Sequence, residues 1–184
     1  MDGTLTVSVH NFDWMREELQ LDKGEPILET LHKMPIEQAA PLWKKVDEME
    51  FYFATRAKPM PHIKTLLNKL SGKGVKLGII TRNTFPVVLQ TLETCQLSQF
   101  FTEQAIVDRA ACAPKPLPDG VNWLMNTWQA DANDTVMVGD YLYDLQAGRA
   151  ANVATIHIDT EGNFNWPEYT DWAISNFDEI INFV

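Results

Sequence analysis

Four short polar motifs gather side chains that can bind a metal ion, hold an anion or transfer a proton. They are Asp2-Gly3-Thr4-Leu5-Thr6, Thr81-Arg82-Asn83, Lys115-Pro116-Leu117-Pro118 and Gly139-Asp140-Tyr141-Leu142-Tyr143-Asp144. Their carboxylates, hydroxyls, amide and ammonium group are what a site needs to bind a divalent cation and an anion side by side.

Asp140 and Asp144 offer two carboxylates one helical turn apart, directly after an apolar run. Magnesium prefers oxygen ligands, keeps several waters and shares the phosphate of a substrate, so a site with few protein ligands suits it. The same two residues also fit a helix N-cap followed by an exposed aspartate in the first turn. Taken alone, the pair leaves both interpretations open.

Thr81 ends the apolar run Val75–Ile80 and precedes a helical pattern, so its hydroxyl and N–H could hold an anion or simply cap a helix. Lys115 is the only lysine in residues 93–184, which hold three basic and fourteen acidic residues. It could neutralise a phosphate oxygen or a carboxylate cluster, or it could be a solvated loop lysine. Asp2 alone indicates only a turn.

Helical and strand periods alternate from Pro61 onward, which predicts the elements that position these motifs. Helical stripes cover 63–70, 85–92, 121–128, 142–151 and 178–183, and the predicted strands are Val75–Ile80, Ala105–Val107, Thr135–Val138, Val153–Ile158 and Trp172–Ile174. Such alternation predicts an α/β fold with a Rossmann-like, mostly parallel sheet. Ligands bind such sheets at the carboxyl ends of the strands, where two of the motifs lie directly.

Residues 11–58 read as helical throughout, in segments Phe12–Leu21, Pro26–Met34 and Pro35–Ala57. Pro41 should break or kink the third segment. We expect this stretch to form a small helical cap inserted into a core made of residues 1–10 and 59–184. The alternative is that these helices simply pack on the sheet.

The composition excludes several classes of protein. Of 184 residues, 45% are hydrophobic and 22% charged, as in ordinary globular domains. The net charge of −10 and the lack of any Lys/Arg-rich run argue against a nucleic-acid partner. Two separate cysteines make no disulfide framework, and no apolar stretch is long enough for a membrane span. We therefore expect a cytoplasmic protein.

The four motifs, in this order, resemble those of the haloacid dehalogenase (HAD) superfamily, whose members are mostly magnesium-dependent phosphatases. The resemblance covers essentially the whole chain, and the helical stretch 11–58 lies where the family places a helical cap. It is greatest to phosphoglycolate-phosphatase-like and β-phosphoglucomutase-like members. The resemblance implies a HAD-like α/β core with a small cap.

The resemblance also implies roles in catalysis. Asp2 would be the general acid/base that protonates the leaving group and later activates water. Thr81 would hold the transferring phosphoryl group, and Lys115 would balance the charge of nucleophile and phosphate. Arg82 and Asn83 follow Thr81 and could reach the substrate phosphate, although Asn83 could equally cap a helix.

For the metal, the resemblance implies Mg²⁺ held by Asp140 and by the backbone carbonyl of Asp2. Asp144 would support the ion directly, through water, or by orienting Lys115.

The family's first motif is Asp-x-Asp-Gly-Thr, in which the first aspartate attacks phosphorus. Met1 stands at the "x", so we expect the nucleophile and the short strand carrying it to lie before the first residue given. A start site placed too late, or a fragment, is the favoured explanation. A pseudoenzyme and an unrelated nucleophile are the alternatives.

The expected function is a magnesium-dependent phosphatase that hydrolyses a small phosphate monoester through an aspartyl-phosphate, as a monomer or homodimer. The chain as given should be nearly inactive. A phosphosugar mutase of the same superfamily is the enzymatic alternative. The non-enzymatic one is a phospho-binding or regulatory domain, a dead family member or a receiver-like module; receivers, however, lack a helical insertion like 11–58.

Overall fold

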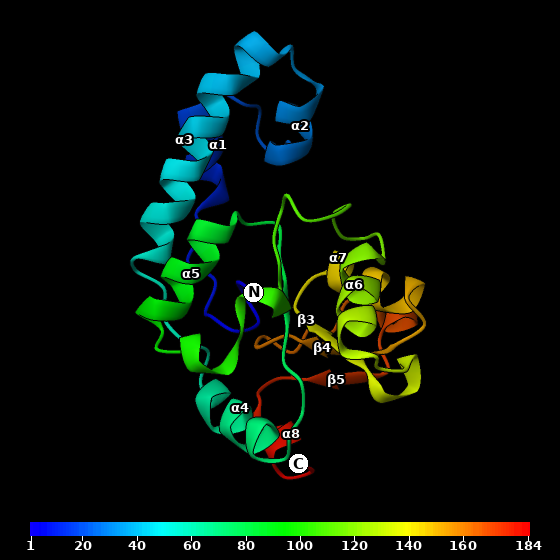
Figure 1. Cartoon of the computed structure of the whole chain (residues 1–184). Coiled ribbons are helices and arrows are strands. Elements are labelled where there is room, and N and C mark those ends of the chain that lie inside the picture. The colour runs from blue at the N-terminus through cyan, green and yellow to red at the C-terminus, as the bar shows by residue number, and fades with distance from the viewer.

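Five short strands, all parallel, form the sheet layer of the computed structural model, which describes residues 1–184 (Figure 1). They are β1 (Ile79–Ile80), β2 (Ile106–Val107), β3 (Val136–Gly139), β4 (Ala154–Ile158) and β5 (Trp172–Ile174). β1 pairs with β2, and β3, β4 and β5 form a separate sheet in that order. The predicted α/β class with a parallel sheet is confirmed.

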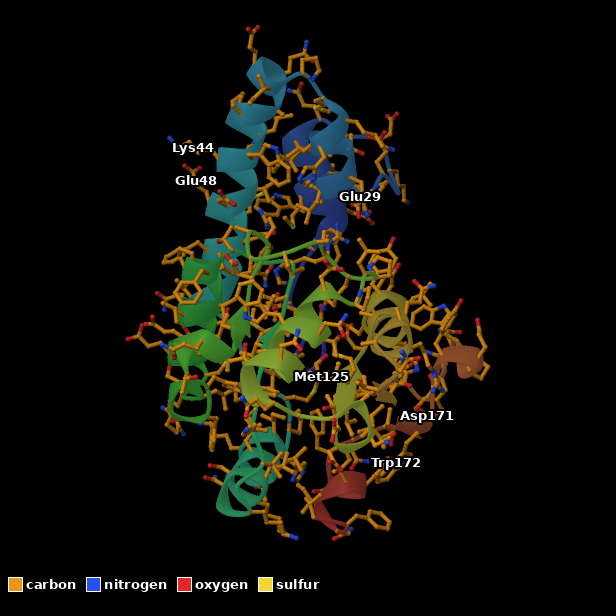
Figure 2. All side chains as sticks on the ribbon, turned by 45° about the vertical axis from the view of Figure 1, so that its right-hand side comes forward. Glu29, Lys44, Glu48, Met125, Asp171 and Trp172 are labelled. Carbon is orange, nitrogen blue, oxygen red and sulfur yellow. The ribbon has the colours of Figure 1, made fainter.

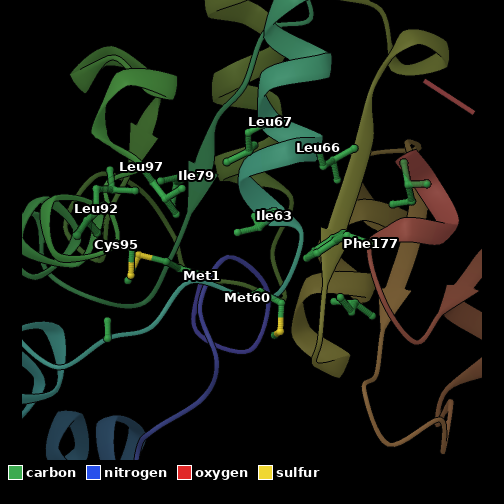
Figure 3. Close-up of a cluster of buried hydrophobic side chains, with 14 of the residues drawn as sticks. Met1, Met60, Ile63, Leu66, Leu67, Ile79, Leu92, Cys95, Leu97 and Phe177 are labelled. Atoms are coloured by element: carbon green, nitrogen blue, oxygen red, sulfur yellow. The ribbon is translucent and has the colours of Figure 1, made fainter. Parts of the chain in front are cut away.

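Five α-helices accompany these strands, and they follow the predicted apolar stripes. They are α4 (Ile63–Gly72), α5 (Phe85–Thr94), α6 (Asp119–Trp128), α7 (Leu142–Ala150) and α8 (Asp178–Ile181). Short 3-10 turns occupy Ser98–Phe100, Glu103–Ala105, Ala132–Asp134 and Pro167–Tyr169. The main hydrophobic cluster joins α4, α5, both sheets and α8, with Met1, Leu66, Leu92 and Phe177 among its members (Figure 3).

The first predicted strand is much shorter than expected. Val75–Ile80 was predicted as one strand, yet only Ile79 and Ile80 pair, with Ile106 and Val107. The partner β2 is itself two residues long, and the other edge of β1 has no hydrogen-bonded neighbour. The prediction was therefore wrong for residues 75–78, because a strand needs a partner along its length.

A cavity of about 840 Å³ separates the two sheets, and most of its lining is apolar. Residues from both facing edges line it, including Ile79 and Ile80 of β1 and Val136 and Val138 of β3. Met1 is also in the lining and is itself buried, so the chain begins in the middle of the molecule (Figure 1).

Three further helices pack on one another away from the sheets, α1 (Phe12–Leu19), α2 (Ile27–Lys33) and α3 (Ile36–Ala54) (Figure 1). We call them the α1–α3 unit. It has its own buried cluster of Met15, Leu19, Ile27, Leu31, Val46, Met49 and Phe53. Lys44 and Glu48 point outward from α3 (Figure 2), and the lower part of α3 packs along α5.

α3 continues through Pro41, so the predicted break does not occur. Proline removes the N–H that would bond the Glu37 carbonyl, but Glu37 lies in the first turn and is exposed. Water can satisfy that carbonyl there, which reduces the cost of the proline.

Two connecting segments join the α1–α3 unit to the rest of the molecule, and they run side by side. The Val7 N–H donates to the Lys58 carbonyl at 2.9 Å, and the Met60 N–H donates to the Leu5 carbonyl at 2.9 Å. These bonds lie next to the turn at Asp2–Thr6.

None of the helices combines the length and the apolar character that crossing a bilayer requires.

Candidate functional site

A second cavity, of about 500 Å³, lies where the α1–α3 unit faces the carboxyl ends of the strands. All seven residues singled out from the sequence line it: Asp2, Thr81, Arg82, Asn83, Lys115, Asp140 and Asp144. The four motifs, distant in sequence, therefore meet at one place. The α1–α3 unit contributes mainly apolar side chains to the opposite wall, together with Arg16, Glu29 and Glu50.

Asp140 follows β3 and is held by the N-terminal turn. The Thr4 hydroxyl donates to Asp140 Oδ1 at 2.7 Å. Gly3 has φ of +75°, and a Cβ built there would lie 2.1 Å from Asp140 Oδ2, so only glycine allows this approach. Burial raises the pKa of Asp140, the terminal ammonium of Met1 opposes that rise, and the nearby Asp144 carboxylate adds to it.

Lys115 and Asp144 form a buried ion pair at the base of the cavity. Their side chains are 9% and 8% exposed, and the Lys115 ammonium also donates to the Ile80 carbonyl at 3.0 Å. Asp144 Oδ2 accepts the Tyr141 N–H at 3.2 Å, which closes the first turn of α7. The resemblance implied that Asp144 supports the metal ion directly, supports it through water, or orients Lys115. Of these three roles, the structure shows the contact with Lys115.

Asp2 is held by groups from two motifs. The Asn83 side-chain amide donates to Asp2 Oδ2 at 2.7 Å, and the Thr6 hydroxyl lies 3.4 Å from Asp2 Oδ1. Thr81 Oγ1 accepts the Asn83 N–H at 3.1 Å. Helix capping by Asn83 is wrong, because α5 begins at Phe85 after Thr84 and the Asn83 side chain is turned toward Asp2 instead.

Arg82 lines the cavity but already has a partner. Its Nη2 lies 2.5 Å from Glu29 Oε1, on α2. Burial pushes the pKa of Glu29 up, but hydrogen bonds from its own backbone and from Arg82 hold that pKa below its ordinary value. Arg82 therefore joins the strand-end loop to the α1–α3 unit.

Three residues near this cavity were not singled out from the sequence as functional. The His10 ring packs against Phe12 and Phe53, with Nδ1 4.0 Å from Asp2 Oδ1. Arg109, in the loop after β2, bonds Glu50 of α3.

A signal for Glu50 existed in the sequence. It stands four residues after Val46 and four before Ala54, on the apolar face of α3, where a charged residue needs a partner. Burial raises the pKa of Glu50 to about 7, against the lowering effect of the Arg109 guanidinium. Nothing comparable in the sequence marks Arg109 or His10.

The oxygen ligands at the site fit magnesium better than a metal ion that binds only to protein side chains. No group of three or more His, Cys, Asp or Glu side chains is arranged to surround an ion. Asp140 nevertheless presents a partly buried carboxylate whose hydrogen bonds come from the Thr4 hydroxyl and its own backbone, and burial raises its pKa, so the charged form gains from a nearby cation. One or two protein carboxylates completed by waters and a phosphate is the usual arrangement for Mg²⁺.

Comparison with known proteins agrees with this arrangement. Residues 5–158 match the family described as haloacid dehalogenase-like hydrolase. The chain is 27% identical to pyrophosphatase PpaX of Oceanobacillus iheyensis, over 97% of this chain and 85% of that protein. It is 32% identical to a phosphoglycolate phosphatase of Nitrosospira multiformis, over 70% of this chain and 53% of that protein.

Solved structures show the same fold. A HAD hydrolase of family IA, variant 3, from Entamoeba histolytica superposes with a TM-score of 0.83 at 17% identity, covering 97% of this chain and 92% of that one. A hydrolase from Pseudomonas syringae gives 0.80 at 20% identity, covering 99% and 94%. The motif order, the fold and the family match lead to one conclusion: the chain belongs to the haloacid dehalogenase-like hydrolases.

Proposed function

We propose that this protein is a magnesium-dependent phosphatase that acts on a small phosphate monoester through an aspartyl-phosphate. The observation that carries the proposal is the buried Lys115–Asp144 pair, which faces the same cavity as Thr81, Asp2 and Asp140. A buried cation and a hydroxyl that converge on one cavity suit a phosphoryl group, whose charge spreads over three oxygens during transfer. The relatives named as phosphatases support the same class of chemistry.

Each residue then has a defined task. Thr81 and Lys115 hold the phosphoryl oxygens, and Asn83 keeps the Asp2 carboxylate turned toward the cavity. Asp2 gives a proton to the leaving oxygen and later takes one from water. Asp140 and the Asp2 carbonyl would hold Mg²⁺, which when bound would neutralise charge on the phosphate. Asp144 orients Lys115.

The nucleophile belongs two positions before Asp2 by the family's first motif, and we place it in a longer form of the chain. The 840 Å³ cavity between β1 and β3 supports this, because two facing strand edges there have no hydrogen-bonded partner. A short apolar strand would fill that space and end at Met1. Reading the codons upstream of Met1 tests the idea: apolar codons followed by aspartate support it, and an in-frame stop contradicts it.

We further propose that the α1–α3 unit is the cap of this site. It lies over the strand ends, and it presents Phe12, Met15 and Ile27 to the cavity. Such a wall excludes water from the reacting centre and selects the leaving group of the substrate.

The deciding experiment is a phosphate-release screen over a panel of phosphate esters, with Mg²⁺ and with chelator. The screen should use the 184-residue chain and a chain extended upstream of Met1. We expect turnover by the extended chain only, lost in chelator. Binding of phosphate without turnover by either chain would favour a regulatory, phospho-binding domain. Release of an isomeric phosphosugar would favour a mutase.

A further inference from the structure

Arg109 bonds both the 81–83 loop and helix α3. It follows β2, and its side chain is only 16% exposed. Its backbone N–H donates to the Asn83 carbonyl at 3.0 Å, and its Nε donates to the Arg82 carbonyl at 2.6 Å. Both carbonyls belong to the 81–83 loop, so Arg109 holds that loop through its backbone carbonyls.

The other end of the same guanidinium reaches α3. Its Nη2 donates to Glu50 at 2.7 Å and 2.6 Å, and its Nη1 lies 3.3 Å from Asp47. The guanidinium also lies over the Trp43 ring, 5.4 Å from its centre. Arginine suits this position because its planar fork holds several acceptors in fixed directions, which a lysine cannot do.

These contacts form a continuous chain from α3 to the acid/base residue. Glu50 holds Arg109, Arg109 holds the Asn83 carbonyl, and the Asn83 side chain holds Asp2. The Arg109 and Glu50 side chains are 16% and 8% exposed, so a shift of α3 alone would separate a largely buried pair. A shift of α3 is therefore costly unless the 81–83 loop moves with it.

We propose that Arg109 is a positioning residue that ties the α1–α3 unit to the 81–83 loop, so that placement of the unit sets the geometry of Asn83 and Asp2. The proposal rests on the proposed function only where it assigns the loop to phosphate. The mechanical coupling stands on the contacts themselves.

The test perturbs one end of this chain and measures the other. Glu50→Gln keeps the shape of the side chain and removes its charge. Hydrogen exchange at about pH 8, where Glu50 is mainly ionised in the native chain, is followed by mass spectrometry. We expect exchange at residues 81–85 to rise by about threefold or more, although the substitution is in α3. Arg109→Gln should do the same, and Arg109→Lys should give an intermediate effect.

Phosphate binding gives the second measurement. Titration of inorganic phosphate with Mg²⁺ into the native chain should show binding that Arg109→Gln and Glu50→Gln weaken by about tenfold. The double variant should bind no worse than the weaker single variant, because both changes break one connection. Arg149→Gln is the matched control: it removes an arginine–aspartate pair with Asp171, outside the cavity, and should leave both measurements unchanged.

The outcomes separate the two proposals. Faster exchange in α3 alone, with residues 81–85 and phosphate affinity unchanged, would overturn the role of Arg109. Failure of the native chain to bind phosphate would count against the proposed function, while the exchange measurement would still decide the coupling. If Arg109→Gln does not fold, Glu50→Gln and Arg109→Lys decide it.

Discussion

Asn83 holds Asp2: its side-chain nitrogen donates to Asp2 Oδ2 at 2.7 Å, across 81 positions of the chain. Asn83→Asp would replace this bond with two carboxylates in contact. We expect it to lower the free energy of unfolding by about 2 kcal/mol near neutral pH, because a partly buried like-charge pair replaces a charge-assisted bond.

Urea unfolding at several pH values checks this prediction. The deficit should shrink in acid, where one carboxylate of the pair takes up a proton and can donate again. Asn83→Ala is the control, since it removes the bond without adding charge. A deficit of equal size at all pH values would contradict the like-charge explanation.

Lys115→Met should remove the charge that compensates buried Asp144 while keeping a side chain of similar length. We expect a loss of about 3 kcal/mol or more in the free energy of unfolding, because the unpaired carboxylate stays buried. Lys45→Met removes a pair with Glu18 in which both side chains are about two-fifths exposed, and should change stability by about 1 kcal/mol or less. Chemical denaturation measures the free energy of unfolding of both variants. Equal losses would contradict the prediction that burial makes the loss of Lys115 more costly.

Gly3→Ala should disturb the site far more than a glycine change elsewhere. Its Cβ would meet Asp140 Oδ2 at 2.1 Å, whereas Gly24, with φ of +84°, has nothing within 4 Å. Gly24→Ala should therefore cost only backbone strain, about 1 kcal/mol, and Gly3→Ala should cost clearly more. Thermal unfolding gives the comparison. Equal costs would mean that the turn moves easily away from Asp140.

The stability of the native chain should depend on pH through Glu50. Its pKa is about 7 in the folded chain against 4.5 for an ordinary glutamate, so the folded state holds this proton more tightly. Stability from this group is thus greatest below pH 4.5 and falls as the pH rises toward 7, by up to about 1.4 kcal/mol per pH unit.

The measurement is urea unfolding of the native chain and of Glu50→Gln between about pH 5 and pH 8. As the pH rises, the free energy of unfolding of Glu50→Gln should increase relative to that of the native chain. Asp47→Asn should make the slope slightly smaller but not abolish it, because the Asp47 carboxylate contributes to the raised pKa of Glu50. A native slope preserved in Glu50→Gln would contradict the assignment.

Magnesium should stabilise the chain through Asp140. A ligand present at a hundred times its Kd adds about 2.7 kcal/mol to the folded state, which raises Tm. Asp140→Asn should reduce that rise, because an amide is a neutral and weaker ligand for a hard cation. Asp134→Asn, an exposed change in the turn before β3, is the control. An undiminished rise in Asp140→Asn would place the ion elsewhere.

The sequence predicted much of this fold because the apolar periods of α4, α5, α6 and α7 are local. The meeting of the four motifs was also predictable, since strand ends in a parallel sheet share one edge. The strand prediction was wrong for residues 75–78, because strand pairing depends on a neighbouring strand that the local pattern does not reveal. The break predicted as one outcome at Pro41 does not occur, because the cost of the proline depends on whether water reaches the Glu37 carbonyl.

The least predictable part was the contact between the α1–α3 unit and the loops. Arg109 and Glu50 are 59 positions apart, and Arg82 and Glu29 are 53 apart. Such pairs depend on how two separately packed units dock. Only the position of Glu50 within an apolar helical face hinted that a partner must exist.

Residues 93–184 contain three basic side chains, and all three are committed: Arg109 to Glu50 and Asp47, Lys115 to Asp144, and Arg149 to Asp171. The fourteen acidic residues of that half therefore give its surface a largely uncompensated negative potential. An anion diffusing toward the cavity is repelled from that side, and its path of lowest electrostatic work passes over the N-terminal half. Added salt screens this repulsion, so encounter with a charged substrate should become faster as ionic strength rises, the reverse of ordinary electrostatic steering.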